Sequence, residues 1–389
     1  MIQRNYIYPE RPEQAMSRLY IHFPFCKQAC YYCNFHFSTS MHQRNEMLKQ
    51  LLNELELQQH FLPDRQLKSI YFGGGTPSLL QTHELEAIFN QIRRFYTVAQ
   101  DAEITLEANP DDITRERLLQ FLRLGINRLS MGVQSFFDED LVYMNRSHHA
   151  AQAKRSLQQV KEAGFESFSV DLIFGYPLLS HDKWKQNLEI LLGYSPPHIS
   201  AYSLTVEPQT AWSVFVKKGT YAPVDNEQAA GHFEYLMETL EGAGYEQYEI
   251  SNYSIPGKRA RHNSSYWHQE AYLGIGPSAH SYNGVKRQWN ISNNALYIKS
   301  LQMNHIPFEE EILTREQKLN EYMMVSLRTS EGLSISSVQS QMKAEEFTDW
   351  FSQTALWIQQ GMLLHEDHYL RLTRKGKLMA DGIAADLFV

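Results

Sequence analysis

Cysteine is scarce in this chain: the 389 residues include three cysteines, and all of them lie within eight positions, at Cys26, Cys30 and Cys33. An odd number of cysteines with no distant partner excludes a disulfide framework. Long apolar runs are also missing, which argues against a membrane span, and the first residues lack the apolar stretch of a signal peptide. Reduced thiols then predict a cytoplasmic protein, with at most a peripheral contact to a membrane.

Positive charge is in deficit as well. The chain has 36 lysines and arginines against 44 aspartates and glutamates, a formal net charge of −8. A nucleic-acid surface needs a basic stripe, so we expect no nucleic-acid partner. Hydrophobic residues at 43% and aromatic residues at 12% are sufficient for a large core, and the length suits one large α/β domain with a smaller second one.

The three cysteines are spaced C-x3-C-x2-C, so that thiols from one short loop can hold one small object from one side. Iron–sulfur clusters are bound by such thiolates, and a cluster held at three corners keeps its fourth iron open. Zinc is the alternative, with His22 or His36 completing a tetrahedron in a zinc-stabilised interaction protein. Structural zinc sites usually combine two separated ligand pairs, and no second pair is present, so the spacing favours the cluster.

Apolar runs alternate with amphipathic stretches through the first 205 residues. We predict strands at 18–23, 68–72, 103–107, 128–133, 167–174 and 199–204, separated by helices near 41–60, 82–96, 114–124, 150–163 and 181–193. Such alternation indicates βαβ units and a parallel sheet. Six units are fewer than the eight of a closed barrel, so we expect an α/β fold with a partial (β/α)6 barrel of the TIM type.

The pattern changes along the chain and suggests four parts. Residues 1–17 form an N-terminal extension, 18–225 the partial barrel, 226–309 a segment that completes it, and 310–389 a small C-terminal domain. The third part has a helix at 225–243 and then a predicted loop region, rich in glycine, serine, asparagine and histidine, from about 250 to 295. Helices at 314–327 and 345–359 and a hairpin at 361–372 make the last part winged-helix-like.

The residues that end each predicted strand are informative, because chemistry in a parallel barrel gathers at the carboxyl ends of its strands. The first strand runs into the cysteine loop, and the second ends in Gly73-Gly74-Gly75-Thr76-Pro77. Glycines allow a backbone to approach a ligand closely. The third strand ends at Glu107, a carboxylate that a cationic ligand would justify if it is buried.

The C-x3-C-x2-C loop after a strand resembles the signature of the radical SAM superfamily, whose [4Fe–4S] cluster binds S-adenosylmethionine at its open iron. The string from Tyr20 through Cys26, YIHFPFC, followed by Cys33-Asn34-Phe35, resembles the HemW branch more closely. That branch comprises haem chaperones related to the oxygen-independent coproporphyrinogen III dehydrogenase. The resemblance covers nearly the whole chain and implies the same partial barrel.

The resemblance also implies roles for residues at the strand ends. It places Glu107 at the methionine ammonium, Arg146 at the carboxylate, and Gln134 and Asp171 at the ribose hydroxyls of S-adenosylmethionine. The loop of Gly74, Gly75 and Thr76 would offer backbone carbonyls to the ammonium group. Tyr20 and Tyr32 would border the cluster and the ligand.

A later motif, Arg261–Trp267 (RHNSSYW), supplies haem candidates. Neutral imidazole is an ordinary axial ligand of haem iron, and the aromatic faces of Tyr266 and Trp267 suit a flat porphyrin. A lone histidine is more often structural, but the H-N-x-x-Y-W string resembles the HemW signature associated with haem and makes His262 a candidate. His280, in the sequence GIGPSAH, is a second candidate or simply lines the cofactor cavity.

We therefore expect a haem chaperone that carries a [4Fe–4S] cluster, binds S-adenosylmethionine and haem, and delivers haem to cytochromes, with a reductant protein as partner where turnover occurs. The alternative is the coproporphyrinogen III dehydrogenase itself. The dehydrogenase has a fourth cysteine two residues past the third, where this chain has Phe35, and a longer N-terminal segment, whereas 17 residues precede the first strand here. Both differences favour the chaperone, so we expect no dehydrogenase activity. Whether the chain is an enzyme of another kind is open.

Overall fold

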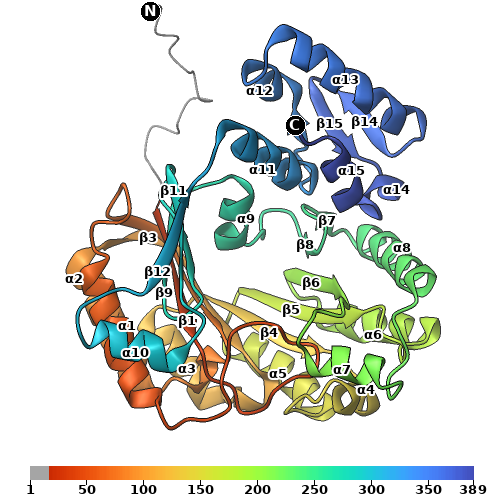
Figure 1. The fold of residues 1–389 in the computed structure, drawn as a ribbon. Helices are drawn as coiled ribbons and strands as arrows, with labels where there is room; N and C mark the ends of the chain where they lie inside the picture. The colour runs from red at the N-terminus through yellow and green to blue at the C-terminus, as the bar shows by residue number, and fades with distance from the viewer. Residues whose placement is uncertain (1–16) are drawn as a thin grey trace, which may run out of the picture.

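The computed structural model describes residues 17–389 of the chain (Figure 1). The predicted N-terminal extension therefore lies outside the described residues, except for Ser17. Within them, none of the helices combines the length and the hydropathy that crossing a bilayer requires.

Six consecutive parallel strands form the centre of the large sheet. Every second side chain of the first strand, at Leu19, Ile21 and Phe23, is buried in the hydrophobic core, as expected where side chains alternate between two faces. The predicted strands were correct in number and order. Their bounds are β1 (Ser17–Phe23), β2 (Gln66–Gly74), β3 (Thr97–Ala108), β4 (Arg128–Gln134), β5 (Ser167–Phe174) and β6 (His198–Ser203).

Helices follow these strands and cover the outer face of the curved sheet (Figure 1). Their ends follow local chemistry: the hydroxyl of Thr114 accepts a hydrogen bond from the N–H of Arg117 at 3.2 Å, and Gly125 ends the same helix with φ +94°. The α/β partial barrel with six βα units is thus confirmed. The helices are α1 (Arg44–Leu57), α2 (Thr82–Phe95), α3 (Arg115–Leu124), α4 (Asp138–Tyr143), α5 (Ala150–Glu162), α6 (His181–Tyr194), α7 (Ala211–Lys217) and α8 (Asn226–Gly242), with single 3-10 turns at Pro77–Leu79 and Pro110–Asp112.

The predicted loop between about 250 and 295 is wrong, because this region forms strands that widen the sheet on both edges. β9 pairs in parallel with β1, whereas β10, β11 and β12 continue that edge antiparallel, and β8 and β7 add to β6. The strands are two to five residues long, too short for their alternation to stand out in the sequence. The elements are β7 (Glu246–Gln247), β8 (Asn252–Ser254), α9 (Arg261–Trp267), β9 (Tyr272–Ile275), β10 (His280–Tyr282), β11 (Lys286–Asn290), α10 (Asn294–Leu301) and β12 (Phe308–Ile312).

Glu54 joins the early and late parts of the sheet. This carboxylate of α1 is fully buried and accepts hydrogen bonds from the backbone N–H of Gly276 at 2.8 Å, from Nδ2 of Asn290 at 2.6 Å and from the hydroxyl of Tyr297. Gly276 itself has φ +110°, and a Cβ there would lie 2.4 Å from the carbonyl oxygen of His22. The glycine at position 276 is therefore explained by packing against β1, whereas a Cβ at Gly274 would lie 2.1 Å from the carbonyl oxygen of His280.

Replacing Glu54 with glutamine should lower the free energy of unfolding by about 1–3 kcal/mol, because the new amide group would face donors that now point at a carboxylate. Urea unfolding at neutral pH measures the change. Glu56→Gln on the same helix is the matched control, since Glu56 is 48% exposed and surface changes stay within about 0.5 kcal/mol. Equal stability of the two variants would contradict the anchoring role of Glu54.

The C-terminal part has a hydrophobic core of its own around Trp350, whose Nε1 donates to the carbonyl of Leu387 at 3.0 Å. Five helices and a three-stranded sheet of order β13-β15-β14 give the winged-helix-like arrangement that the sequence predicts. Helix α13 has acidic residues in its first turn and no lysine or arginine. The elements are α11 (Arg315–Leu327), β13 (Leu333–Ser334), α12 (Ile335–Ser340), α13 (Ala344–Gln359), β14 (Leu363–Glu366), β15 (Tyr369–Leu372), α14 (Arg374–Lys377) and α15 (Ala380–Asp386).

Candidate cofactor cavity

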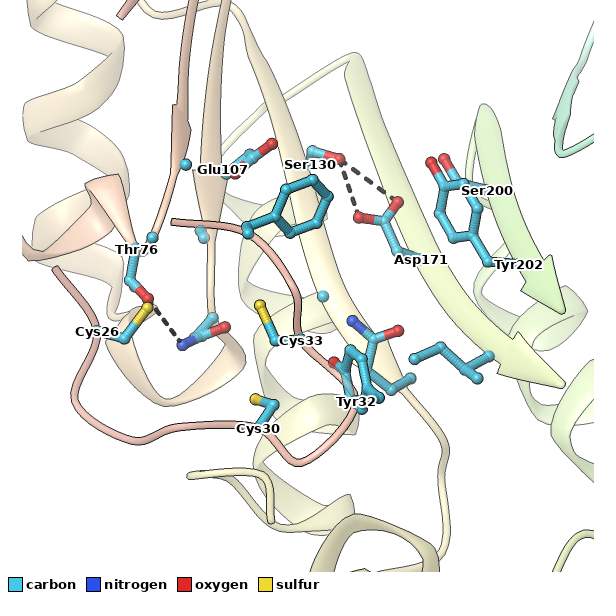
Figure 2. A pocket seen from close by; sticks show the side chains of 18 of the residues that line it. Cys26, Cys30, Tyr32, Cys33, Thr76, Glu107, Ser130, Asp171, Ser200 and Tyr202 are labelled. Carbon is cyan, nitrogen blue, oxygen red and sulfur yellow. Dashed lines mark hydrogen bonds between the residues drawn. The ribbon is translucent and has the colours of Figure 1, made fainter. Parts of the chain in front are cut away.

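A cavity of about 400 Å³ opens at the carboxyl ends of the parallel strands, beside the cysteine loop (Figure 2). This volume lies in the range of small-molecule sites. The structure brings to its wall every residue predicted for the cluster and for S-adenosylmethionine except Tyr20. These residues are Cys26, Cys30, Tyr32, Cys33, Gly74, Gly75, Thr76, Glu107, Gln134, Arg146 and Asp171.

The cysteine loop is held by backbone hydrogen bonds to its neighbours. The N–H of Cys26 donates to Ser38 O at 3.0 Å, and the N–H of Tyr31 donates to Met144 O at 3.1 Å. Burial raises the pKa of Cys26 to about 11 and that of Cys33 to about 12. Without a bound metal these two thiols are therefore protonated at neutral pH, and loading of a metal centre would release their protons.

The zinc alternative fits this geometry poorly. A single zinc ion needs its ligands around one point, and no three histidine, cysteine or acidic side chains among residues 17–389 are gathered in that way. His22 donates or accepts at both ring nitrogens, with Tyr20 Oη at 3.1 Å and His36 O at 2.9 Å. His36 in turn bonds Asn294 Oδ1 at 2.7 Å. Three thiols that each meet a different iron suit a cluster better.

The glycine turn after β2 is explained by contacts within the protein. Gly74 has φ +103°, and a Cβ there would lie 2.6 Å from the ring of His22. A Cβ at Gly75 would meet the backbone N and O of Phe25 at 2.7 Å. The N–H of Thr76 donates to Phe25 O at 2.8 Å. The glycines therefore allow the turn to lie directly against the cysteine loop.

Glu107, the penultimate residue of β3, contributes a half-buried carboxyl group to the cavity (Figure 2). Burial, followed by the charge of Asp171, raises the pKa of Glu107 to about 7, although the hydroxyl of Tyr71 donates to its Oε1 at 2.8 Å. Tyr20 lies next to this pair without lining the cavity, since a Cβ at Gly73 would touch both Tyr20 and Glu107. A cationic ligand would favour the ionised form of Glu107.

Arg146 connects the cysteine loop to the ends of β3 and β4. Its Nη1 lies 3.2 Å from Cys30 Sγ and 3.3 Å from Tyr32 Oη, and its Nη2 donates to Asn109 Oδ1 at 2.8 Å and to Gly132 O at 2.7 Å. The Nε atom is buried without a partner among the described residues. Arg146 therefore holds the cysteine loop in place. To contact the methionine carboxylate as predicted, its guanidinium would have to bind that group in addition to its present partners.

Gln134 and Asp171 present acceptors on the opposite wall. Gln134 has φ +67°, a conformation that side chains rarely adopt, and its Oε1 is buried with no hydrogen-bond partner in the described part of the chain. Asp171 accepts from the hydroxyl of Ser130 at 3.1 Å (Figure 2). It also accepts from the hydroxyl of Ser169 at 3.0 Å. An unpaired buried acceptor is costly, and a hydroxyl-bearing ligand would satisfy it.

The haem candidates do not line the cofactor cavity, so they do not form a site that haem would share with S-adenosylmethionine. These candidates are His262, Tyr266, Trp267 and His280. His262 is 1% exposed and uses both ring nitrogens, with Ser69 Oγ at 2.7 Å and Tyr266 Oη at 2.9 Å. Trp267 lies under the guanidinium of Arg328, 5.9 Å from the ring centroid. In this conformation His262 has no free nitrogen for iron, because it joins α9 to β2. His280 is exposed on β10.

The sequence interpretation missed several cavity residues, among them Arg128, Ser130 and His198. It considered only where strands end, whereas these residues lie earlier in β4 and β6. The signal was available: Arg128, Ser130, Gly132 and Gln134 follow the two-residue period that places them on one face of the strand. Asn263, the neighbour of His262, also lines the cavity and is the residue of α9 that does so.

Comparison with known proteins agrees with this geometry. Residues 20–191 match the family model described as "Radical SAM superfamily", and residues 313–379 match the "HemN C-terminal domain". The fold superposes on coproporphyrinogen III oxidase (HemN) from Escherichia coli, described as a radical SAM enzyme, with a TM-score of 0.84 over 98% of this chain and 92% of that chain. At 22% sequence identity this likeness concerns the fold alone.

The fold and the cysteine loop thus define a protein of the radical SAM superfamily. Two curated relatives narrow the class. Heme chaperone HemW of Bacillus subtilis (strain 168) is 32% identical over 95% of this chain and 98% of that protein, and HemW of Escherichia coli (strain K12) is 38% identical over 67% and 69%. The chain belongs to the HemW family.

Proposed function

We propose that this protein is a haem chaperone: it binds haem and hands it to haem-requiring cytochromes, while its cavity holds a [4Fe–4S] cluster and S-adenosylmethionine. The observation that carries the cofactor part is one cavity lined by three cysteines, by the carboxyl of Glu107 with its raised pKa, and by Gln134, whose Oε1 has no partner among the described residues. The haem part rests on family membership, because the relatives are described as heme chaperones.

The residues present fit both cofactors. Cys26, Cys30 and Cys33 would hold the cluster, which when bound supplies a redox centre with one iron open to a further ligand. Glu107 would bind the ammonium group of S-adenosylmethionine, and Gln134 with Asp171 would accept from its hydroxyls. Arg146 keeps Cys30 and Tyr32 in place for this.

His280 is the better placed of the two histidines for haem. Burial and the charge of Arg287 lower the pKa of His280, which keeps its imidazole neutral as haem ligation requires. Its ring stacks on Trp289, with centroids 6.2 Å apart, and the apolar side chain of Val285, at the turn between β10 and β11, is 57% exposed. We propose that the imidazole of His280, on β10, ligates the iron of the bound haem.

Visible spectroscopy of the haem-loaded protein tests this assignment. His280→Ala should shift or abolish the haem absorption band, whereas folded His262→Ala should keep the wild-type spectrum, because His262 is occupied by Ser69 and Tyr266. Circular dichroism establishes that each variant is folded. An unchanged spectrum in His280→Ala, or a shift in folded His262→Ala, would contradict the assignment.

The proposed role also suggests which proteins accept the haem and where in the cell this protein works. Cytochromes that need haem would receive it, a reductant protein would serve the cluster where electrons are consumed, and reduced thiols suit the cytoplasm.

A further inference from the structure

The cofactor cavity continues past Asp171 toward the start of the strands, into a polar region that the proposed cofactors do not explain. Its wall includes Thr105 of β3, Arg128 of β4, His198 of β6 and Asn263 of α9. We call these four residues the deep subsite. They come from four separate elements, so the barrel fold itself brings them together.

Arg128 is the cation of this region, and it is 2% exposed. Its Nη1 donates a hydrogen bond to the hydroxyl of Ser167 at 2.7 Å. Among residues 17–389 no carboxylate lies within 4.0 Å of its nitrogens. Asp171 is near enough for the charge of Arg128 to counter part of the rise that burial causes in the pKa of that carboxyl, but it does not contact the guanidinium. A buried cation without a direct ion pair costs several kcal/mol.

The acidic groups of the barrel interior already have other partners. Asp171 accepts from Ser130 and Ser169, and the carboxylate of Glu103 accepts from the backbone N–H groups of Arg261 and His262 at 3.0 and 2.8 Å. These bonds hold the acidic groups in place away from the guanidinium. The cavity side of Arg128 is therefore open to an anion from outside the protein.

The other members of the deep subsite are polar side chains that would surround a small anion bound to Arg128. The hydroxyl oxygen of Thr105 is buried and has no partner in the described structure. His198 is bonded at Nδ1 to Ser169 Oγ at 2.8 Å and at Nε2 to Tyr248 Oη at 2.7 Å, so it adds no second charge that would need balancing. The amide of Asn263 lines the same space.

We propose that the deep subsite binds the carboxylate of a small organic acid, with the guanidinium of Arg128 as its charged partner and Thr105 and Asn263 as further hydrogen-bonding groups. Guanidinium and carboxylate match in planar, two-bond geometry, which distinguishes this ligand class from a neutral one. The subsite lies at the other end of the cavity from the cysteines and does not depend on haem transfer. It would place a second ligand beside the position proposed for S-adenosylmethionine.

Thermal unfolding of the full-length protein with simple probes tests the proposal. The probes are sodium propionate, succinate and benzoate, each compared with its neutral amide and with sodium chloride at equal ionic strength. We expect at least one carboxylate to raise the melting temperature in a saturable way, by about 2 °C at ten times its dissociation constant, and the amides to have no such effect.

Three variants decide where the effect arises. Arg128→Met should lose the carboxylate effect and melt, without ligand, no lower than wild type, because an unpaired buried charge has been removed. Arg128→Lys keeps the charge without the planar fork and should show a smaller effect. Arg123→Met removes an exposed arginine of helix α3 that does not line the cavity, so it should keep the wild-type effect.

The proposal is overturned if none of the three carboxylates acts on the wild type, or if the effect is the same in Arg128→Met. A ligand-free melting temperature of Arg128→Met well below that of wild type, together with a retained carboxylate effect, would show that Arg128 is structural. If Arg128→Met does not fold, an undiminished effect in Arg128→Lys and Asn263→Ala together overturns the proposal in the same way.

Discussion

Replacing Cys30 with serine is expected to remove the iron from this protein. Wild-type protein reconstituted without oxygen should be brown and hold about four irons per chain, as a [4Fe–4S] cluster requires. The serine variant should hold less than about one iron per chain, because the two remaining cysteines cannot retain a cluster that needs three thiolates. Iron and sulfide analysis together with the visible spectrum measures the loss.

The matched control is Phe35→Leu, two residues past the last cysteine. Phe35 lines the cavity mouth and is 70% exposed, so its replacement should leave the iron content unchanged. Zinc in place of iron in freshly isolated wild-type protein, or full iron retention in Cys30→Ser, would contradict the assignment of the cysteine loop.

Replacing Glu107 with glutamine should weaken the binding of S-adenosylmethionine by about 10- to 100-fold, the usual effect of losing a hydrogen bond to a charged group. Desolvation in the cavity raises the pKa of this carboxyl to about 7, so a cationic ammonium group would stabilise its ionised form. Equilibrium binding at pH 8 measures the effect. Glu84→Gln, on helix α2, is a buried carboxylate outside the cavity and should leave the affinity unchanged.

The same substitution has a second expected effect, on stability without ligand. The folded protein keeps a proton on Glu107 between its ordinary pKa of 4.5 and about 7, whereas the unfolded chain loses it. Stability contributed by this group therefore falls as the pH rises through that window. Glu107→Gln should melt higher than wild type at pH 8 and equally at pH 4.5. A lower melting temperature of Glu107→Gln than of wild type at pH 8 would contradict the prediction that the ligand-free fold disfavours the ionised form of Glu107.

Much of the barrel could be predicted from the sequence, because β1 to β6 are long enough for their apolar runs to stand out between amphipathic helices. The edges could not, since β7 to β10 have two to four residues, and the pairings that join them to the barrel, β8 with β6 and β9 with β1, connect distant parts of the chain. Pairing of β9 with β1 depends on a contact between Gly276 and His22 that only the folded chain defines.

The cofactor side of the cavity was predictable for a related reason. Cys26 comes three residues after β1, Glu107 is the penultimate residue of β3, and Asp171 lies in the second half of β5. The carboxyl ends of parallel strands meet at one edge. Arg128 and His262 show the limits of this rule. Arg128 begins its strand yet reaches the cavity, and His262 belongs to a conspicuous motif yet is occupied by Ser69 and Tyr266. Side-chain direction, and not position in a motif, decides these cases.

The role as a haem chaperone is tested most directly by two assays on one reconstituted sample. Haem titration should reach about one haem per chain, and coproporphyrinogen III incubated with S-adenosylmethionine and reductant should remain unconverted. Formation of the decarboxylated product, or a failure to bind haem, would contradict the chaperone assignment.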